Sequence, residues 1–200
     1  MYSPQYAVET DRSKIDSVIR ENPFATIIYT DNSRPESFHL PLIIQGDKLI
    51  GHMAKANPAW KKIAAKTILV IFHGPQGYIS PEFYGTQNNV GTWNYISIHV
   101  RGKVTISQEE KELKDALLLL SRSQDPNFDI ESNIADHSEL LKGIVALKIS
   151  IDEVFAKFKL AQSKSIKERV NVIEKLKTQS KSMELAKAME RTLPNEEVGE

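Results

Sequence analysis

The residues with the clearest chemical potential lie in the segment Gly51–Trp60, GHMAKANPAW. Its first half has the apolar residues of a strand, and Asn57 and Pro58 have the form of a helix start, with Asn57 as the N-cap. A helix start leaves backbone N–H groups unpaired and carries partial positive charge, so it suits a phosphate. Lys55 adds a full positive charge, and His52 ends the strand. The segment therefore predicts either an ordinary helix cap or an anion site.

Polar and aromatic residues also gather at the ends of other predicted strands. These clusters are His39-Leu-Pro41, His73–Tyr84 and Thr92–Tyr95. Aromatic side chains close to Gly and Pro can stack on a planar ring while backbone groups hydrogen-bond to its edge. Packing in a core or an interface explains Trp93 and Tyr95 equally well. Together the clusters favour a planar cofactor that carries a phosphate.

Other kinds of site find little support in the sequence. The histidines at positions 39, 52, 73, 99 and 137 lack the HExxH or HxH spacing of a metal site, so we expect no metal. No Ser lies in a GxSxG motif, and the Gly residues form neither a P-loop nor a dinucleotide fingerprint. The chain has no Cys, which excludes disulfides, thiolate metal sites and a cysteine nucleophile.

Composition and charge bound the class of protein. Of the 200 residues, 40% are hydrophobic and 26% are charged, which is enough for an ordinary core. No apolar run approaches the ~20 residues that span a bilayer, and the N-terminus lacks an apolar signal segment. We therefore expect a cytoplasmic protein without membrane contact. The net charge is zero, but residues 155–191 hold 10 Lys/Arg against 4 Asp/Glu. This basic segment is either a solvated helical face or a surface for DNA.

The pattern along the chain predicts an α+β fold built on an antiparallel barrel of six or seven strands with peripheral helices. The residues 73–77 are expected to form a loop, and two capping boxes are expected at Ser107–Glu110 and Ser165–Glu168. The expected strands cover residues 24–30, 37–44, 48–54, 67–72, 78–80, 92–107 and 143–151. The expected helices cover residues 11–21, 58–65, 107–121 and 132–142, with two more in the basic segment.

The chain resembles the PaiB family of FMN-binding negative transcriptional regulators. The matching blocks run from residue 1 to about residue 162 and so cover most of the chain. They are Met1-Tyr-x-Pro4, His39-Leu-Pro41, Gly51–Trp60, Phe72–Pro81, Thr92–Tyr95, Val100–Lys103 and Lys157–Gln162. The last block departs from the family pattern, because Ala161-Gln-Ser-Lys164 stands where Ser-Gln-Asn-Arg is expected after Leu160.

The resemblance implies a split β-barrel related to pyridoxamine phosphate oxidases, in a homodimer with FMN near the subunit interface. It implies an FMN-binding domain over residues 1–162 and a basic helical segment over residues 163–200. Lys55 and Asn57 would hold the phosphate, and Trp60 would lie beside them. The expected residues near the ring or the ribityl chain are His39, His52, Tyr78, Ser80, Trp93 and Asn94, with Lys159 and Gln162 as further contacts.

Three functions remain open at this point. The first is a flavin-binding repressor whose basic C-terminal segment, with Lys157, Lys159, Lys164, Lys167 and Arg169, contacts DNA. The second is an FMN-dependent oxidoreductase or a haem-handling protein, in which His39, His52 or His99 serves as a proton donor or haem ligand. The third is a dimeric binding module without a cofactor. The sequence leaves enzymatic activity undecided.

Overall fold

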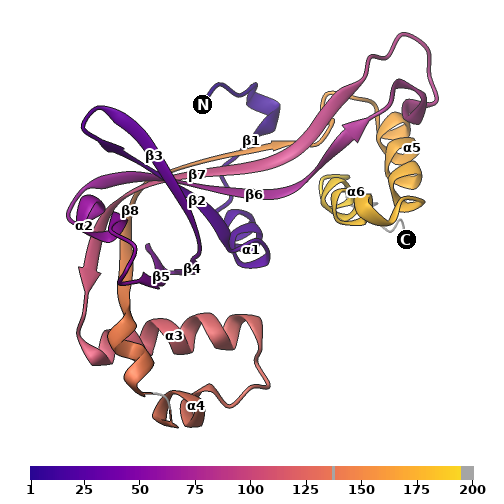
Figure 1. Ribbon diagram of the computed structural model, residues 1–200. Coiled ribbons are helices and arrows are strands. Elements are labelled where there is room, and N and C mark those ends of the chain that lie inside the picture. The colour runs from indigo at the N-terminus through magenta and orange to yellow at the C-terminus, as the bar shows by residue number, and fades with distance from the viewer. Residues whose placement is uncertain (137, 195–200) are drawn as a thin grey trace. The chain divides into compact units, whose positions relative to one another are not determined.

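Eight strands form one antiparallel sheet in the computed structural model, which describes residues 1–136 and 138–194 (Figure 1). The order along the sheet is β3-β2-β6-β7-β8-β5-β4, and β1 pairs with β8. Among the described residues this order does not close into a ring. The strands are β1 (Val8–Glu9), β2 (Phe24–Asp31), β3 (Arg34–Pro41), β4 (Ile43–Gln45), β5 (Lys48–Ala54), β6 (Thr67–Ile79), β7 (Thr92–Ser107) and β8 (Ile144–Lys159).

Six α-helices and four short 3-10 helices complete the described residues. None of these helices has the length and apolar composition to cross a membrane. The α-helices are α1 (Arg12–Glu21), α2 (Ala59–Ile63), α3 (Glu110–Gln124), α4 (Ile130–Asp136), α5 (Ile166–Lys177) and α6 (Met183–Glu190). The 3-10 helices are η1 (Gln5–Ala7), η2 (Pro81–Tyr84), η3 (Ser138–Gly143) and η4 (Ser180–Ser182). The predicted α+β class is confirmed, with eight strands instead of six or seven.

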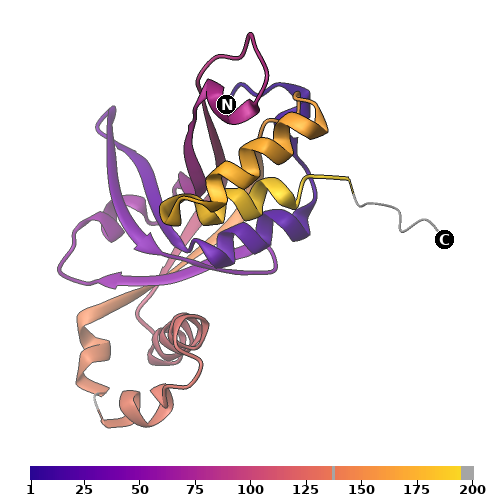
Figure 2. The same cartoon turned by 90° about the vertical axis from the view of Figure 1, so that its right-hand side faces the viewer.

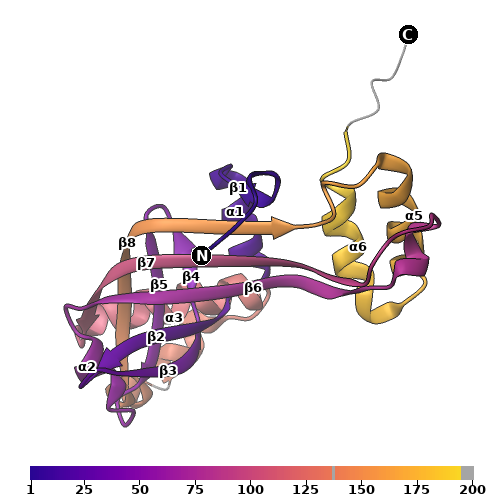
Figure 3. The ribbon, with the colours of Figure 1, turned by 90° about the horizontal axis from the view of Figure 1, so that it is seen from above.

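The chain divides into two compact units, each built from separate stretches of sequence. The first unit contains residues 1–10, 73–97 and 155–200, and the second contains residues 11–72 and 98–154. Strands β6, β7 and β8 are neighbours in the sheet (Figure 3), and each of them contributes residues to both units. Because the units interleave along the chain, the division expected at residue 162 stays a prediction. Residues 195–200, at the end of the helical segment expected over residues 163–200, lie outside the described residues.

Tight turns and a buried helix face shape the second unit. Asn32 and Ser33 have φ values of +46° and +64° and connect β2 to β3, while Gly46 with φ +56° begins the turn between β4 and β5. Helix α1 buries the face formed by Ile15, Val18 and Ile19, as its 3.6-residue spacing predicts. This helix therefore has an apolar face packed in the unit.

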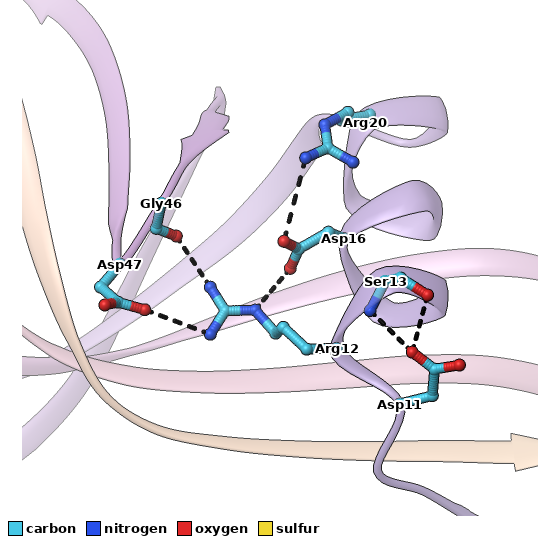
Figure 4. A network of polar contacts seen from close by, with 7 residues as sticks. All are labelled: Asp11, Arg12, Ser13, Asp16, Arg20, Gly46 and Asp47. Carbon is cyan, nitrogen blue, oxygen red and sulfur yellow. Dashed lines mark hydrogen bonds and ion pairs between the residues drawn. The ribbon is translucent and has the colours of Figure 1, made fainter.

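Arg12 at the start of α1 links this helix to the turn between β4 and β5 (Figure 4). Its guanidinium donates to the carbonyl oxygen of Gly46 at 2.8 Å and lies 3.3 Å from Oδ1 of Asp47. Its Nε donates to Oδ1 of Asp16 at 2.6 Å, and Arg20 lies 3.9 Å from the other oxygen of Asp16. One guanidinium thus joins a helix to a hairpin more than thirty residues away in sequence.

In the first unit, helices α5 and α6 pack against each other (Figure 2), and α5 also contacts η2. The apolar side chains Leu185 and Met189 of α6 are fully buried. A Cβ on Gly77 of β6 would lie 3.0 Å from Leu185, so the strand and the helix are in close contact. The predicted capping box of α5 is confirmed, with the Ser165 hydroxyl and the Glu168 carboxylate each accepting from the other's backbone N–H.

Strand β6 continues to Ile79 through the segment 73–77, where the sequence analysis wrongly predicted a loop. The prediction relied on Gly74, Pro75 and Gly77, which are common in turns. The pairing of β6 with β2 covers only Leu69–Ile71, so Pro75 lies beyond it. A Pro is tolerated in a strand where no neighbour needs its missing N–H.

Three other predicted boundaries are also corrected. Helix α3 has no capping box, because β7 extends to Ser107 and Glu109 takes the N-cap position without a side-chain bond. Strand β8 runs to Lys159 instead of ending at Ile151, and an ion pair of 2.5 Å between Arg101 and Glu153 accompanies the added length. The helix expected over residues 132–142 is divided between α4 and η3, and His137 lies outside the described residues.

Candidate functional site

The junction between β5 and α2 is held by side-chain bonds to its own backbone. Oδ1 of Asn57 accepts from the N–H of Ala59 at 3.0 Å, as an N-cap does. The helix begins at Ala59, so Pro58 occupies the N-cap position that was predicted for Asn57. The indole Nε1 of Trp60 donates to the carbonyl oxygen of Lys55 at 3.0 Å. Asn57 and Trp60 therefore fix the path of the backbone around Lys55.

This geometry limits what the start of α2 offers to an anion. The helix has five residues, and one of its first N–H groups is already bonded to Asn57. The exposed Lys55 lines a groove of about 480 Å³ together with Glu110, Glu139 and Lys142. Lys142 is paired with Glu139 at 2.7 Å. The positive charge of Lys55 is thus the main attraction for a phosphate here, and carboxylates share its groove.

Two histidines of the second unit, His39 and His52, occupy different environments. His39 is exposed on β3, and its ring stacks on Phe24 with a centroid distance of 5.8 Å and an interplanar angle of 19°. His52 is half-buried on β5, and its Nδ1 has no partner among the described residues. Burial lowers the pKa of His52, since the charged imidazolium is poorly solvated there. Within the described part of the chain, no group of three or more potential metal ligands comes together.

Tyr78 and Trp93 form an aromatic pair in the first unit. Their ring centroids lie 6.5 Å apart with an interplanar angle of 49°, and the residues are 55% and 48% exposed. The indole Nε1 of Trp93 donates to Gln76 at 3.3 Å. Gly91 lies against Tyr78, because a Cβ there would come within 2.0 Å of the phenol oxygen. The pair offers exposed aromatic surface at a defined place on β6 and β7.

Lys159 and Asn94 line a small pocket, and neither Tyr78 nor Trp93 is among its lining residues. Asn94 directly follows Trp93 on β7, so the two side chains point to opposite faces of the sheet. The ammonium of Lys159 donates to the Thr92 hydroxyl at 2.7 Å and to the Trp93 carbonyl oxygen at 2.8 Å. Asn94 is 1% exposed, its Nδ2 donates to the Met189 sulfur at 3.5 Å, and its Oδ1 has no partner among the described residues. An amide buried with an unpaired oxygen is unusual and points to a ligand or a structural water.

Ser80 and Gln162 serve local structure. The Ser80 hydroxyl accepts from the N–H of Glu82 at 3.4 Å and caps η2. The Gln162 side chain accepts from the N–H of Leu160 at 2.8 Å and donates to the Phe158 carbonyl oxygen at 2.5 Å. These bonds hold the turn after β8, where Ala161 has a φ of +63°.

Sequence reasoning did not select Lys164 or Glu168 as cofactor-binding residues, and it named Lys164 only among the basic residues for DNA. The Glu168 carboxylate accepts from Thr86 at 2.8 Å and Asn89 at 3.2 Å, and Lys164 donates to Asn89 at 2.6 Å. The hydroxyl bonds from Thr86 and Ser165 lower the pKa of Glu168 to about 2. These residues fix the loop that leads to Thr92. The available signal was Lys164 itself, which stands where the family pattern has Arg.

The eleven predicted site residues fall into two groups, one in each compact unit. The second unit holds the group around the β5–α2 junction, and the first unit holds the group around the aromatic pair. The former group is His39, His52, Lys55, Asn57 and Trp60, and the latter is Tyr78, Ser80, Trp93, Asn94, Lys159 and Gln162. Their role in binding a cofactor stays a prediction for each group.

Comparisons with known proteins give the family and the fold. The family model FMN_bind_2, described as "Putative FMN-binding domain", matches residues 1–153. The chain is 32% identical over 205 residues to the protein "Protease synthase and sporulation protein PAI 2" of Bacillus subtilis, covering 96% of this chain and 98% of that protein.

Two solved structures share the fold at low sequence identity. The FAD and heme binding protein from Mycobacterium smegmatis has a TM-score of 0.64 at 17% identity, covering 82% of this chain and 78% of that one. The flavocytochrome Anf3 from Azotobacter vinelandii has a TM-score of 0.63 at 16% identity, covering 78% and 72%. The fold is therefore that of the flavin-binding split barrels, and the chain belongs to the PaiB family of FMN_bind_2 proteins.

Proposed function

We propose that the chain binds FMN without a covalent bond. The observation that carries the proposal is the pair Tyr78 and Trp93, whose half-exposed rings can stack against a planar ring. Membership of a family named for an FMN-binding domain favours FMN over other planar cofactors. Bound FMN would supply hydride or electron transfer, while the chain would supply binding and orientation.

In the second unit, Lys55 is a proposed phosphate contact that rests on the family motif and is tested separately from the aromatic pair, because it is exposed and its carbonyl is fixed by Trp60. FMN differs from riboflavin by its phosphate, so the two ligands test this residue directly. We expect Lys55→Met to weaken FMN binding by about 10-fold, the value of one charge-assisted hydrogen bond, and to leave riboflavin binding unchanged. Lys61→Met is the matched control, since Lys61 lies over the Trp60 ring instead.

The experiment is a fluorescence titration of the purified full-length protein with FMN and with riboflavin. Quenching of FMN fluorescence by the protein, together with release of FMN from the purified protein on denaturation, would support the proposal. A colourless protein that quenches neither ligand would leave the cofactor-free module as the better description. Equal effects of Lys55→Met on both ligands would remove Lys55 from the phosphate site.

We propose further that the protein acts as a negative transcriptional regulator of the PaiB type and works in the cytoplasm. The name of the PAI 2 relative supports a role in gene expression. The basic segment offers exposed Lys167, whereas Arg169 is 7% exposed and Lys177 is paired with Glu174 and Glu190. Direct contact with DNA would therefore use only part of this segment.

A gel-shift titration at several salt concentrations, with and without FMN, tests the regulator. Binding to DNA should weaken steeply as salt rises, because Lys and Arg contacts release counterions from phosphates. Lys167→Glu should weaken the complex, while Lys187→Glu is a control, since Lys187 is already paired with Glu184 at 2.8 Å. Absence of any salt-sensitive complex would remove direct DNA binding.

A homodimer is part of the same proposal. Besides Tyr78 and Trp93, the first unit leaves the apolar residues Tyr2, Tyr6 and Val90 exposed. Such exposed apolar residues are typical of association surfaces. Sedimentation of the purified protein should give a mass of about twice 22.6 kDa. A protein that stays monomeric over the whole micromolar range would contradict the proposed dimer and would leave the proposal of FMN binding unaffected.

A further inference from the structure

The loop over residues 85–91, which connects η2 to β7 in the first unit, is tied to the start of α5. The Glu168 carboxylate is the centre of these bonds. Its Oε1 accepts from the Thr86 hydroxyl at 2.8 Å and from Nδ2 of Asn89 at 3.2 Å. Its Oε2 accepts from the backbone N–H and the hydroxyl of Ser165 at 3.1 Å and 2.8 Å. One carboxylate therefore joins the loop to the first turn of the helix.

The amide of Asn89 is held in one orientation. Its Nδ2 donates to the Thr86 hydroxyl oxygen at 2.7 Å as well as to Glu168, and its Oδ1 accepts from the Lys164 ammonium at 2.6 Å. The donor side of the amide thus faces a carboxylate, and the acceptor side faces an ammonium. Hydrogen bonds to charged groups are stronger than bonds between neutral groups. The network therefore fixes the place of Asn89 in the loop.

Asn171, one turn further along α5, holds the other end of the loop. Its Nδ2 donates to the Tyr84 carbonyl oxygen at 2.8 Å. Gly85 has a φ of +66°, and a Cβ on it would lie 2.7 Å from the same Nδ2. Only a glycine combines that backbone conformation with so close an approach. Helix α5 thus grips the loop near both of its ends.

Gly91 passes the position of the loop on to Tyr78. It lies two residues after Asn89, and a Cβ on it would come within 2.0 Å of the Tyr78 phenol oxygen and 2.8 Å of its Cζ. The Tyr78 ring therefore lies directly against the backbone at Gly91, and a displacement of Gly91 must move the ring, since packed atoms cannot overlap. The ring in turn pairs with Trp93.

We propose that Glu168 and Asn89 are positioning residues, which fix the geometry of the Tyr78–Trp93 pair from α5. They act through the loop and through the contact of Gly91 with Tyr78. The effect on the two rings stands without a ligand, whereas its consequence for FMN rests on the proposed function. The inference gives α5 a structural role at the aromatic pair, which a basic helix taken as a surface for DNA does not have.

Fluorine NMR of the full-length protein labelled with 5-fluorotryptophan tests the effect on the rings. The chain has two tryptophans, so two signals are expected, and Trp60→Phe assigns them. Trp60 belongs to the second unit and serves as the internal reference for Trp93. We expect Thr86→Val and Asn89→Ala to shift or broaden the Trp93 signal and to leave the Trp60 signal in place. Thr86→Ser keeps the hydroxyl and should keep the wild-type Trp93 signal.

Ser165→Ala is the matched control for a weakened helix. It removes the side-chain cap of α5 but leaves the bonds of Glu168 to Thr86 and Asn89. We expect it to lower stability without moving the Trp93 signal. An unmoved Trp93 signal in both Thr86→Val and Asn89→Ala would overturn the proposal, and so would an equal shift in Ser165→Ala.

A titration of the same variants with FMN separates this proposal from the proposed function. If the aromatic pair stacks on the flavin, Asn89→Ala should weaken FMN binding by about 3- to 10-fold, the fold-change expected for a displaced aromatic contact. Ser165→Ala should bind FMN as wild type does. A shifted Trp93 signal with wild-type FMN affinity would support the positioning role and contradict the aromatic pair as the flavin site.

Discussion

Asn57 shows how one side chain can serve structure at a place where the sequence predicts binding. Its Oδ1 accepts from the N–H of Ala59, which is the bond that starts α2. We expect Asn57→Ala to lower the free energy of unfolding by about 1 kcal/mol, as removal of a helix cap typically does. Asn57→Asp keeps an acceptor at the same place and should retain most of the stability. Urea unfolding of both variants measures the difference, and equal losses would show that the acceptor does not matter.

His52 should make stability depend on pH. Burial lowers its folded-state pKa, whereas an unfolded His binds a proton below about pH 6.5. Between these two values the unfolded chain holds more protons, so the free energy of unfolding falls as the pH is lowered through this window. His52→Gln should reduce that fall, measured by urea unfolding at about pH 7.5 and about pH 5.5. Asn57→Ala, which keeps His52, should retain the wild-type pH dependence; an unchanged dependence in His52→Gln would contradict the assignment.

The sequence selects candidate site residues but does not reveal their surroundings. Asn94 was selected from its motif, yet its unpaired oxygen results from a contact with Met189, 95 residues later. A motif of four residues contains no information about such a partner. Lys159 was also selected, but its bonds to Thr92 and Trp93 depend on the approach of β7 and β8. The chemical type of a side chain can be read from the sequence, whereas its contacts with residues far away in the chain cannot.

At the scale of elements, substitution of Arg12 tests how α1 is attached to the β4–β5 turn. Its bonds to Gly46, Asp47 and Asp16 lie at a partly exposed surface. We expect Arg12→Met to lower the free energy of unfolding by about 1 kcal/mol, mainly through the lost bond to the Gly46 carbonyl. Arg20→Met on the same helix should cost less than about 0.5 kcal/mol, since Arg20 lies 3.9 Å from Asp16. Equal losses of stability for the two variants in urea unfolding would show that the bonds of Arg12 to the β4–β5 turn contribute no extra stability.

Elements with a strong period were the most predictable. The alternation over Thr92–Ser107 predicted both ends of β7, and the capping box at Ser165 predicted the start of α5. The segment 73–77 was mistaken for a loop because its Gly and Pro residues obey turn preferences locally. Its strand conformation depends on pairing within the sheet, which local preference cannot reveal. Strand β1, with only Val8 and Glu9, is too short to leave a periodic signal.

At the scale of the whole molecule, the two compact units do not follow the order of the sequence. Residues 73–97 share their unit with residues 155–200, so the helices of the basic segment belong to the same core as strand residues of β6 and β7. The sequence shows only a change of composition after about residue 155. A change of charge on exposed positions carries no information about which buried faces pack together.

Removal of residues 163–200 tests whether this segment is an appendage or part of a core. Leu185 and Met189 are fully buried in the first unit, and Leu185 lies against Gly77 of β6. A chain ending at Gln162 lacks Leu185 and Met189 and uncovers the strand residues that they contact, so we expect residues 73–97 to lose protection from amide hydrogen exchange. Residues 24–54 of the second unit should keep their protection, because their strands pair within that unit.

A point variant distinguishes the effect of lost packing from the effect of removing residues 163–200. Leu185→Ala should lower the free energy of unfolding by about 2–4 kcal/mol and weaken protection in residues 73–97 of the full-length protein. Val170→Ala on α5 is the control, since Val170 is 39% exposed and its truncation should cost less than about 0.5 kcal/mol. If the shortened chain kept full protection in residues 73–97, the basic segment would be an appendage, as a boundary at residue 162 implies. Loss of protection in that range, shared by Leu185→Ala, would place α6 in the core that supports Asn94 and the aromatic pair.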